Sequence, residues 1–453
     1  MPIPMPSLRV CAVALALSLA TPSVYALNLL EVVRQAESKD PKFAAIKSTY
    51  LANMEGPAIA RAALLPQAVV SASSTSNTLN QDRTTVNNGL LTLGGRSEYD
   101  SRDVSARLTQ TLFDLPAFRQ YESAELLKSR DEARAVEQVQ QYRLDVANQY
   151  FDVLRAQSAL DLARAREKTL DKRLEEATVK FKLGTLPKLD LLEAQAQFDQ
   201  TRSQRLTAEI SLNAARQQLA TRLGGDRSFQ LAPLKPTPPL IPPVPVESGA
   251  WQQLAQKRNP ALVAARHEVQ SSEKDQGSLI GGYLPQVNAV ATVSQRKISG
   301  SDNLAINLNG GRSDSVGVEL KWELFGGGRT TARLNQATQR TEALKQTLAA
   351  SEATVGSTVA NLFDTVQNDA GRVKANRTAV NSALQAKNAL EAGYKLGTHT
   401  LLDLLTAENR LQQAEIDLRN AQFDYLQNSL RLHASAGVLY DSILSRYNQM
   451  LGQ

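Results

Sequence analysis

The sequence has few of the residues that build most catalytic and metal centres. Its 453 residues include 1 cysteine and 3 histidines, and only 5% are aromatic. A single cysteine excludes a disulfide framework and a metal site built from several cysteines. The histidines are widely separated in the sequence: His267, His399 and His433. Because no serine–histidine–aspartate or paired-carboxylate pattern is identifiable either, the sequence predicts a protein that is not an enzyme and needs no cofactor or metal.

The charge balance does not indicate a particular partner either. The 51 basic residues exceed the 45 acidic ones by six, which is too small an excess for this length to indicate a nucleic-acid partner. Alanine, leucine, glutamine, arginine and glutamate are plentiful instead. This composition favours long helices over a compact enzyme core.

Residues 1–26 have the pattern of an export signal. Arg9 supplies a basic start, Val10–Ala20 is apolar, and Val24-Tyr25-Ala26 resembles a cleavage site. The apolar run is too short for a membrane-spanning helix, which takes about 20 residues. Because Cys11 lies inside this run, we expect a mature, exported chain without cysteine.

The rest of the chain contains one pattern twice. Five short motifs recur in the same order: Asp40-Pro41 and Asn259-Pro260, Leu65-Pro66 and Leu284-Pro285, Leu112-Phe113 and Leu324-Phe325, Lys182–Thr185 and Lys395–Thr398, and Asp190–Leu192 and Asp403–Leu405. The shared order and nearly constant offset indicate an internal duplication.

Each copy predicts the same succession of elements. The first repeat is 27–224 and the second is 248–437, with a proline-rich linker at 225–247 and a C-terminal tail at 438–453. Each repeat is predicted to contain a helix (28–63; 248–282), a β-hairpin (68–113; 287–325), a long helix (116–181; 329–394) and a second shorter helix (187–222; 400–436).

The long helices carry apolar residues at every seventh position. These are Val139, Val146, Val153 and Leu160 in the first copy, and Val359, Val366, Val373 and Val380 in the second. Such spacing predicts a coiled-coil seam against neighbouring helices. At 1.5 Å per residue a 66-residue helix is about 100 Å long, so we expect a rod or a tube wall.

The predicted hairpins alternate between apolar and polar residues. In the second copy, Val316, Val318, Leu320, Trp322 and Leu324 alternate with Gly317, Glu319, Lys321 and Glu323. This period is typical of strands in an outer-membrane barrel. Four strands cannot close a barrel, and open strand edges are not tolerated in lipid. We therefore expect an oligomer with eight strands from two chains or twelve from three.

With these repeated motifs, the chain resembles the TolC family of outer-membrane channels over residues 27 to about 445. The resemblance implies a mostly α-helical, duplicated fold with a β-barrel part. It implies a homotrimer in which four membrane strands per chain close a 12-stranded barrel in the outer membrane of a Gram-negative bacterium. An α-helical tunnel would continue through the periplasm. A periplasmic adaptor and an inner-membrane ABC or proton-driven transporter would dock there.

The resemblance also places a gate where the helix turns meet. It implies that Asp190, Tyr394, His399 and Asp403 form this gate, although the family has an arginine-like residue at His399 and a further acidic residue at Thr406. Three copies of Asp403 around an axis would attract cations. Asp190 bonded to Tyr394 or to protonated His399 would fasten the closed state, and this lock would loosen as pH rises. Alternatively, both aspartates serve only their helix N-termini and Tyr394 only packs.

We interpret the chain as a passive channel for type I protein secretion. The absence of a lipid-anchor cysteine and the similar loops of the two repeats favour secretion over the alternative, an efflux channel for small molecules. A periplasmic coiled-coil scaffold without a pore is a third hypothesis. The alternating stretch Val316–Leu324 argues against it, because a soluble scaffold needs no strand that faces lipid.

Overall fold

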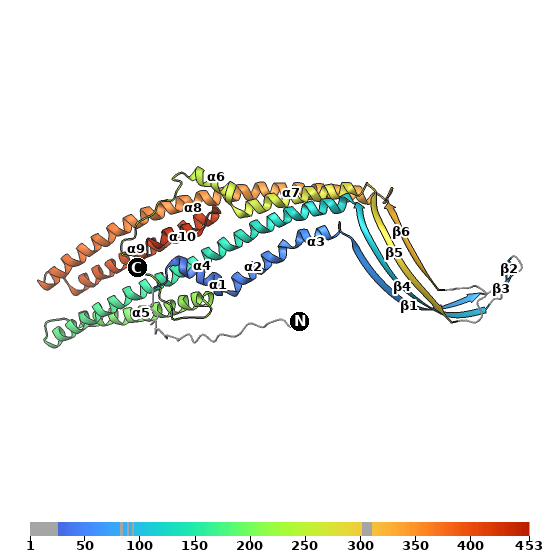
Figure 1. Ribbon diagram of the computed structural model, residues 1–453. Helices are drawn as coiled ribbons and strands as arrows, with labels where there is room; N and C mark the ends of the chain where they lie inside the picture. Colours follow the sequence, from blue (N-terminus) through green and yellow to red (C-terminus); the bar gives the residue numbers. More distant parts are fainter. Residues whose placement is uncertain (1–25, 82–84, 88–89, 93–94, 301–309, 453) are drawn as a thin grey trace, which may run out of the picture.

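The structure is a computed structural model that describes residues 26–81, 85–87, 90–92, 95–300 and 310–452. The predicted export signal, apart from Ala26, therefore lies outside the described residues. The chain is elongated, with a helical part at one end and a β-sheet at the other (Figure 1). This mostly helical architecture with a small antiparallel sheet confirms the predicted fold class.

Two very long helices dominate the helical part. They are α4 (Leu115–Lys182) and α8 (Arg329–Lys395), where the sequence predicts 116–181 and 329–394. The shorter helices lie along them (Figure 1): α1 (Leu29–Lys39), α2 (Pro41–Met54), α3 (Gly56–Ala62), α5 (Lys188–Arg222), α6 (Ser248–Arg258), α7 (Pro260–Gly281), α9 (Leu401–Ser435) and α10 (Asp441–Asn448). No helix in the described part of the chain has the length and hydropathy needed to cross a membrane.

The prediction of one unbroken helix over 28–63 and over 248–282 is wrong. The chain breaks at Asp40 and at Asn259, each followed by proline, and again at Glu55, between α2 and α3. Proline lacks a backbone N–H and pushes the preceding residue out of helical geometry. The Asp40 and Asn259 side chains each accept a hydrogen bond from a backbone N–H of the following helix, at 2.8 and 3.1 Å, so each break begins a new capped helix.

The predicted C-terminal tail, 438–453, contains a helix. Its helix α10 buries Leu444 and Tyr447, three residues apart and therefore on one helical face. The proline-rich linker at 225–247 also lies against the helices, because the Trp251 indole N–H donates to the Pro245 carbonyl at 2.6 Å. Phe229 of the linker and Leu444 and Tyr447 of the tail belong to the main hydrophobic core.

That core fills the middle of the helical part. Its largest fully buried side chains are Trp251, Tyr142, Tyr150, Tyr425, Phe151 and Phe423. The seven-residue pattern is confirmed at six positions that are at most 2% exposed: Val146, Val153, Leu160, Val359, Val366 and Val373. A second, smaller core lies near the ends of the helices away from the sheet, around Leu170 and Leu405.

Four long strands form one antiparallel sheet in the order β1-β4-β5-β6, which leaves β1 and β6 at its edges. The strands are β1 (Gln67–Gln81), β4 (Gly95–Phe113), β5 (Gln286–Ser299) and β6 (Gly311–Lys321); short strands β2 (Thr85–Asn87) and β3 (Leu90–Thr92) form a separate pair.

The strand register separates apolar from charged residues. Residues that pair directly across strands share a face of the sheet. One face collects exposed apolar side chains from all four strands: Val70, Val104, Leu108, Val293, Val316, Val318 and Leu320. On the opposite face, Arg107 and Glu319 form an ion pair at 2.8 Å. The alternation predicted for 316–324 thus belongs to this apolar surface as far as Leu320, whereas Trp322 and Leu324 lie beyond the end of β6.

Candidate functional site

The ends of two helical hairpins form the candidate site, at the end of the molecule away from the sheet (Figure 1). The turns contain Gly184 and Gly397, with φ of 72° and 78°, a left-handed conformation that favours glycine. Each following threonine, Thr185 or Thr398, donates from its backbone N–H at 2.9 Å and its hydroxyl at 3.0 Å to the carbonyl five residues earlier. This helix ending explains why the Lys-Leu-Gly-Thr motif occurs twice.

A small apolar core holds the two hairpins together within one chain. Its buried members come from α4, α5 and α9: Leu170, Ala177, Ala194, Leu401 and Leu405. Tyr394, at the end of α8, packs against this core. The tip is therefore a packed assembly of all four hairpin helices.

Tyr394 is bound by a lysine that the sequence did not single out. The Lys180 ammonium of α4 donates to the Tyr394 hydroxyl at 3.2 Å and lies 4.6 Å from the centre of its ring. This cation–π contact and hydrogen bond join the ends of α4 and α8. The packing role considered for Tyr394 is thus present, together with a specific polar partner.

Asp403 caps its own helix. Its backbone N–H donates to the Thr400 hydroxyl at 3.1 Å, while its carboxylate accepts from the Thr400 hydroxyl at 2.8 Å and from the Thr400 N–H at 3.1 Å. These bonds, with a further contribution from His399, hold the pKa of Asp403 below its usual value. His399 Nδ1 lies 3.8 Å from the carboxylate, and its ring lies so close to Gly393 that a Cβ there would overlap it.

Asp190 stands apart from the other predicted gate residues. It is half-buried in the first turn of α5. Among the described residues of one chain, its side chain makes no hydrogen bond with Tyr394 or His399. The structure therefore brings His399 together with Asp403, and Tyr394 together with Lys180, but does not join Asp190 to either.

Sequence reasoning missed a buried ion cluster near the tip. Arg173 of α4 is 12% exposed and lies 3.2 Å from Glu391 of α8 and 3.4 Å from Glu408 of α9, which is 5% exposed. Hydrogen bonds from Lys387 and Arg173 lower the pKa of Glu391 to about 2. One arginine thus ties α4 to both helices of the second hairpin.

The cluster interrupts an apolar stripe, which is a signal that the sequence did contain. Ala163, Leu170 and Ala177 are buried at seven-residue spacing, and Arg166 and Arg173 take the intermediate positions of the same stripe. Likewise, Glu408 follows Leu401 and Leu405 on α9 at spacings of four and three. Charged residues on a buried helical stripe require partners on the facing helix.

The cluster is only partly satisfied. Arg173 Nε and Glu408 Oε2 are buried without a hydrogen-bond partner in the described part of the chain. A cavity of about 220 Å³ borders Glu408, Arg166 and Lys387. Buried ion pairs with unmet hydrogen bonds add little stability but fix one arrangement over another.

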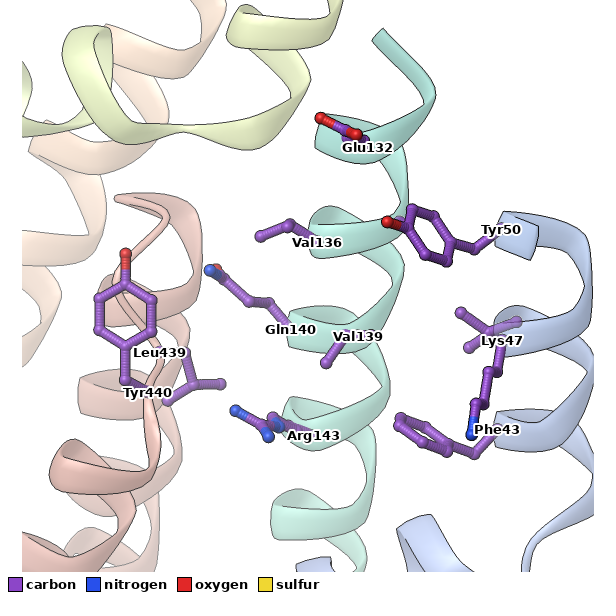
Figure 2. A pocket seen from close by; sticks show the side chains of 12 residues that line it. Phe43, Lys47, Tyr50, Glu132, Val136, Val139, Gln140, Arg143, Leu439 and Tyr440 are labelled. Atoms are coloured by element: carbon purple, nitrogen blue, oxygen red, sulfur yellow. The ribbon is translucent and has the colours of Figure 1, made fainter. Parts of the chain in front are cut away.

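An apolar hollow lies elsewhere, between α2 and α4 (Figure 2). It is about 510 Å³ in volume and is bordered by Phe43 and Tyr50 of α2, Val136 and Val139 of α4, and Tyr440. Along α4, Val139 is roughly 65 Å from the turn that follows Lys182, at 1.5 Å per residue. This apolar hollow is therefore separate from the tip. The described residues also contain no group of three His, Cys, Asp or Glu side chains placed to hold a metal ion.

Comparisons with known proteins agree with this geometry. The family model described as "Outer membrane efflux protein" matches residues 32–225 and 251–438. The chain is 31% identical to the alkaline protease secretion protein AprF of Pseudomonas aeruginosa, over 93% of this chain and 86% of AprF. It is also 31% identical to the outer membrane protein TolC of Vibrio cholerae, over 94% of both chains. The crystal structure of the outer membrane protein VceC of Vibrio cholerae has the same fold, with a TM-score of 0.74 at 19% identity over 91% of this chain and 97% of VceC.

Proposed function

Because the chain belongs to the outer membrane efflux protein family, we propose that it forms the trimeric outer-membrane channel of a type I protein secretion system. Family membership confirms the resemblance to TolC, places the protein in the outer membrane and makes it a channel protein. The trimer, the gate and the secreted substrate are the parts that we propose.

The observation that carries the proposal is the sheet. Its apolar face is exposed on all four strands, and its outer strands β1 and β6 each have one unpaired edge in the described chain. Unpaired strand edges and isolated four-stranded sheets are not stable in lipid. Three chains joined edge to edge close a 12-stranded barrel, with the apolar face toward lipid and the Arg107–Glu319 face toward the lumen.

The duplicated helices support the same trimer. Within one chain α7 packs along α4, and the hydroxyls of Ser123 and Ser271 form a buried hydrogen bond at 2.8 Å. The counterparts of α7 and α4 in the other repeat are α2–α3 and α8. However, α2 buries no residue and Ile59 of α3 is 73% exposed, while α8 buries six side chains and α4 seventeen. We infer that α2–α3 of one chain pack on α8 of the next.

In the closed channel, the Arg173 cluster would hold the α8–α9 hairpin against α4 within each chain. Asp190, which is free of Tyr394 and His399 in the described part of one chain, would reach a neighbouring hairpin only across the trimer interface. Asp403 would face the axis and favour cations. Opening would then require that α8–α9 move away from α4, which breaks the contacts of Arg173 with Glu391 and Glu408.

Protein secretion is supported by the similarity to AprF, whose name describes alkaline protease secretion. Its partners would be a periplasmic adaptor and an inner-membrane ABC transporter. The second candidate is efflux of small molecules, with a proton-driven transporter as the partner. The family description, which names efflux, favours it.

A gene deletion separates these two functions. Under secretion, the deletion strain loses a protein from the culture medium and keeps its tolerance of hydrophobic toxic compounds, and the complemented strain regains the protein. Under efflux, tolerance falls and the secreted proteins stay the same. A chain recovered as a soluble periplasmic monomer would support the scaffold hypothesis and contradict both.

A further inference from the structure

The end of the sheet away from the helices carries cations on its apolar face. Arg102 of β4 pairs directly with Lys297 of β5 and, on its other side, with Ser74 of β1. All three side chains are exposed. A guanidinium, an ammonium and a hydroxyl therefore stand side by side in one row across three strands, one step beyond the row that contains Val104.

This pairing of two cations is unfavourable by itself, because like charges directly opposite on paired strands repel each other. Neither Arg102 nor Lys297 has a carboxylate within 4.0 Å in the described part of the chain. On the opposite face, the neighbouring cations of the same two strands are neutralised: Arg107 by Glu319 at 2.8 Å and Arg296 by Asp103 at 2.5 Å. In the described part of the chain, Arg102 and Lys297 on the apolar face lack the carboxylate partner that Arg107 and Arg296 have on the other face.

The charges of the other ionic groups at this end of the sheet nearly cancel one another. Arg312 of β6 binds Asp314 on the same strand at 3.1 Å, and Arg96 binds Glu98 at 2.8 Å. Asp100 lies one row beyond Arg102, opposite Ser299. The Ser74–Arg102–Lys297 row is therefore the place on this face where positive charge is concentrated and a negative group would be favoured.

The depth of this row identifies the source of that negative group. From Leu112 to Val104 the apolar stretch of β4 extends about 27 Å along the strand, or roughly 20 Å of membrane depth at a tilt of about 40°. An apolar band is about 25 Å tall in barrels of this kind. If the apolar face meets lipid, as the proposed function requires, Arg102 and Lys297 lie just beyond that band, at the depth of the outer headgroups.

We propose that Ser74, Arg102 and Lys297 bind the phosphate groups of anionic lipids in the outer leaflet of the outer membrane. The Arg102 guanidinium presents two parallel N–H groups to phosphate oxygens, Lys297 adds a second charge, and the Ser74 hydroxyl donates a further bond. In a trimer, three such rows surround the barrel. They fix its depth and rotation in the leaflet and relieve the repulsion between the two cations.

Titration of the full-length protein in neutral detergent with a phosphorylated glycolipid, lipid A, tests this site by native mass spectrometry. Dephosphorylated lipid A and inorganic phosphate are titrated in parallel. We expect retention of phosphorylated lipid A to weaken about fivefold for each cation removed, or about 25-fold in the Arg102→Ala/Lys297→Ala variant. The exchange variant Arg102→Lys/Lys297→Arg keeps both charges and should retain binding.

The matched control removes two cations from the same strands on the opposite face, as Arg107→Ala/Arg296→Ala, and should bind lipid A like the wild type. Equal loss in this control, equal binding of dephosphorylated lipid A, or equally tight binding of inorganic phosphate overturns the lipid site. Single-channel conductance of the same preparations tests the proposed function separately. A conducting trimer without phosphate-dependent binding refutes the lipid site alone, and phosphate-dependent binding without a channel refutes the proposed function alone.

Discussion

Replacing Arg173 by alanine should weaken the closed state of the channel. The Arg173 side chain is 12% exposed and its partner Glu408 is 5% exposed, so the substitution leaves a buried carboxylate without its main cation. Removal of one partner of a buried ion pair costs about 3–5 kcal/mol. We place this case at the lower end, about 3 kcal/mol per chain, because Glu391 keeps Lys387 as a partner.

If the contacts exist only in the closed arrangement, this loss shifts the closed-to-open ratio by about 100-fold per chain. Planar-bilayer recording of the purified protein should therefore show higher conductance and more frequent open events in Arg173→Ala than in the wild type. Thermal unfolding should also begin at a lower temperature, since one buried charge is uncompensated.

Two variants serve as controls for this prediction. Arg164→Ala removes an arginine of the same helix whose contact with Glu209 is long, 4.0 Å, and exposed, so it should leave conductance unchanged. The double variant Arg173→Met/Glu408→Leu replaces the pair with apolar side chains of similar size and should stay closed and stable. Wild-type conductance in Arg173→Ala, or the same increase in opening in Arg164→Ala, would refute the proposal that the Arg173 cluster holds the channel closed.

Other changes at the tip have defined outcomes. Because the pKa of Glu391 is lowered from 4.5 to about 2, the stability that its carboxylate contributes is fully present above about pH 4.5 and is lost as pH falls toward 2. Conductance of the wild type should therefore rise as pH falls through that window. The same pH response in a Glu391→Gln variant would contradict this reasoning. Asp403→Asn should reduce cation selectivity, measured as the reversal potential in a salt gradient, and unchanged selectivity would remove Asp403 from the channel axis. Gly397→Ala should lower the free energy of unfolding by about 1–2 kcal/mol, because the φ of 78° at this position suits glycine. Gly356→Ala within α8, where a Cβ meets nothing within 4 Å, should not destabilise the protein. Lys180→Ala should loosen the tip more than Tyr394→Phe, since the phenyl ring keeps the cation–π contact; conductance of the two variants compares them.

Local patterns in the sequence predict the elements that depend on neighbouring residues. The seven-residue spacing of Val146, Val153 and Leu160 identifies a buried seam, because a helix brings such positions to one face. The alternation at Val316, Val318 and Leu320 identifies a strand with one apolar face. Gly184 and Gly397 mark the two hairpin turns, where a left-handed residue is required.

Features that depend on distant residues were not predictable in this way. Arg173 meets Glu391 and Glu408, 218 and 235 residues away, and spacing within α4 does not show which partner faces it. The partner of Tyr394 is likewise Lys180, 214 residues away, and not Asp190. The breaks at Asp40 and Asn259 follow from a local signal, because the residue before a proline is disfavoured in helical geometry, and the prediction of one continuous helix overlooked it.

The central claim is that three copies of this chain close a channel through the outer membrane. Single-channel recording of protein purified from outer-membrane fractions, with the mass of the conducting species measured in the same sample, tests it most directly. The account predicts discrete conductance steps that prefer cations, from a species with three times the mass of the processed chain. Monomeric protein, or an outer-membrane protein that shows no conductance in either the wild type or Arg173→Ala, would contradict it.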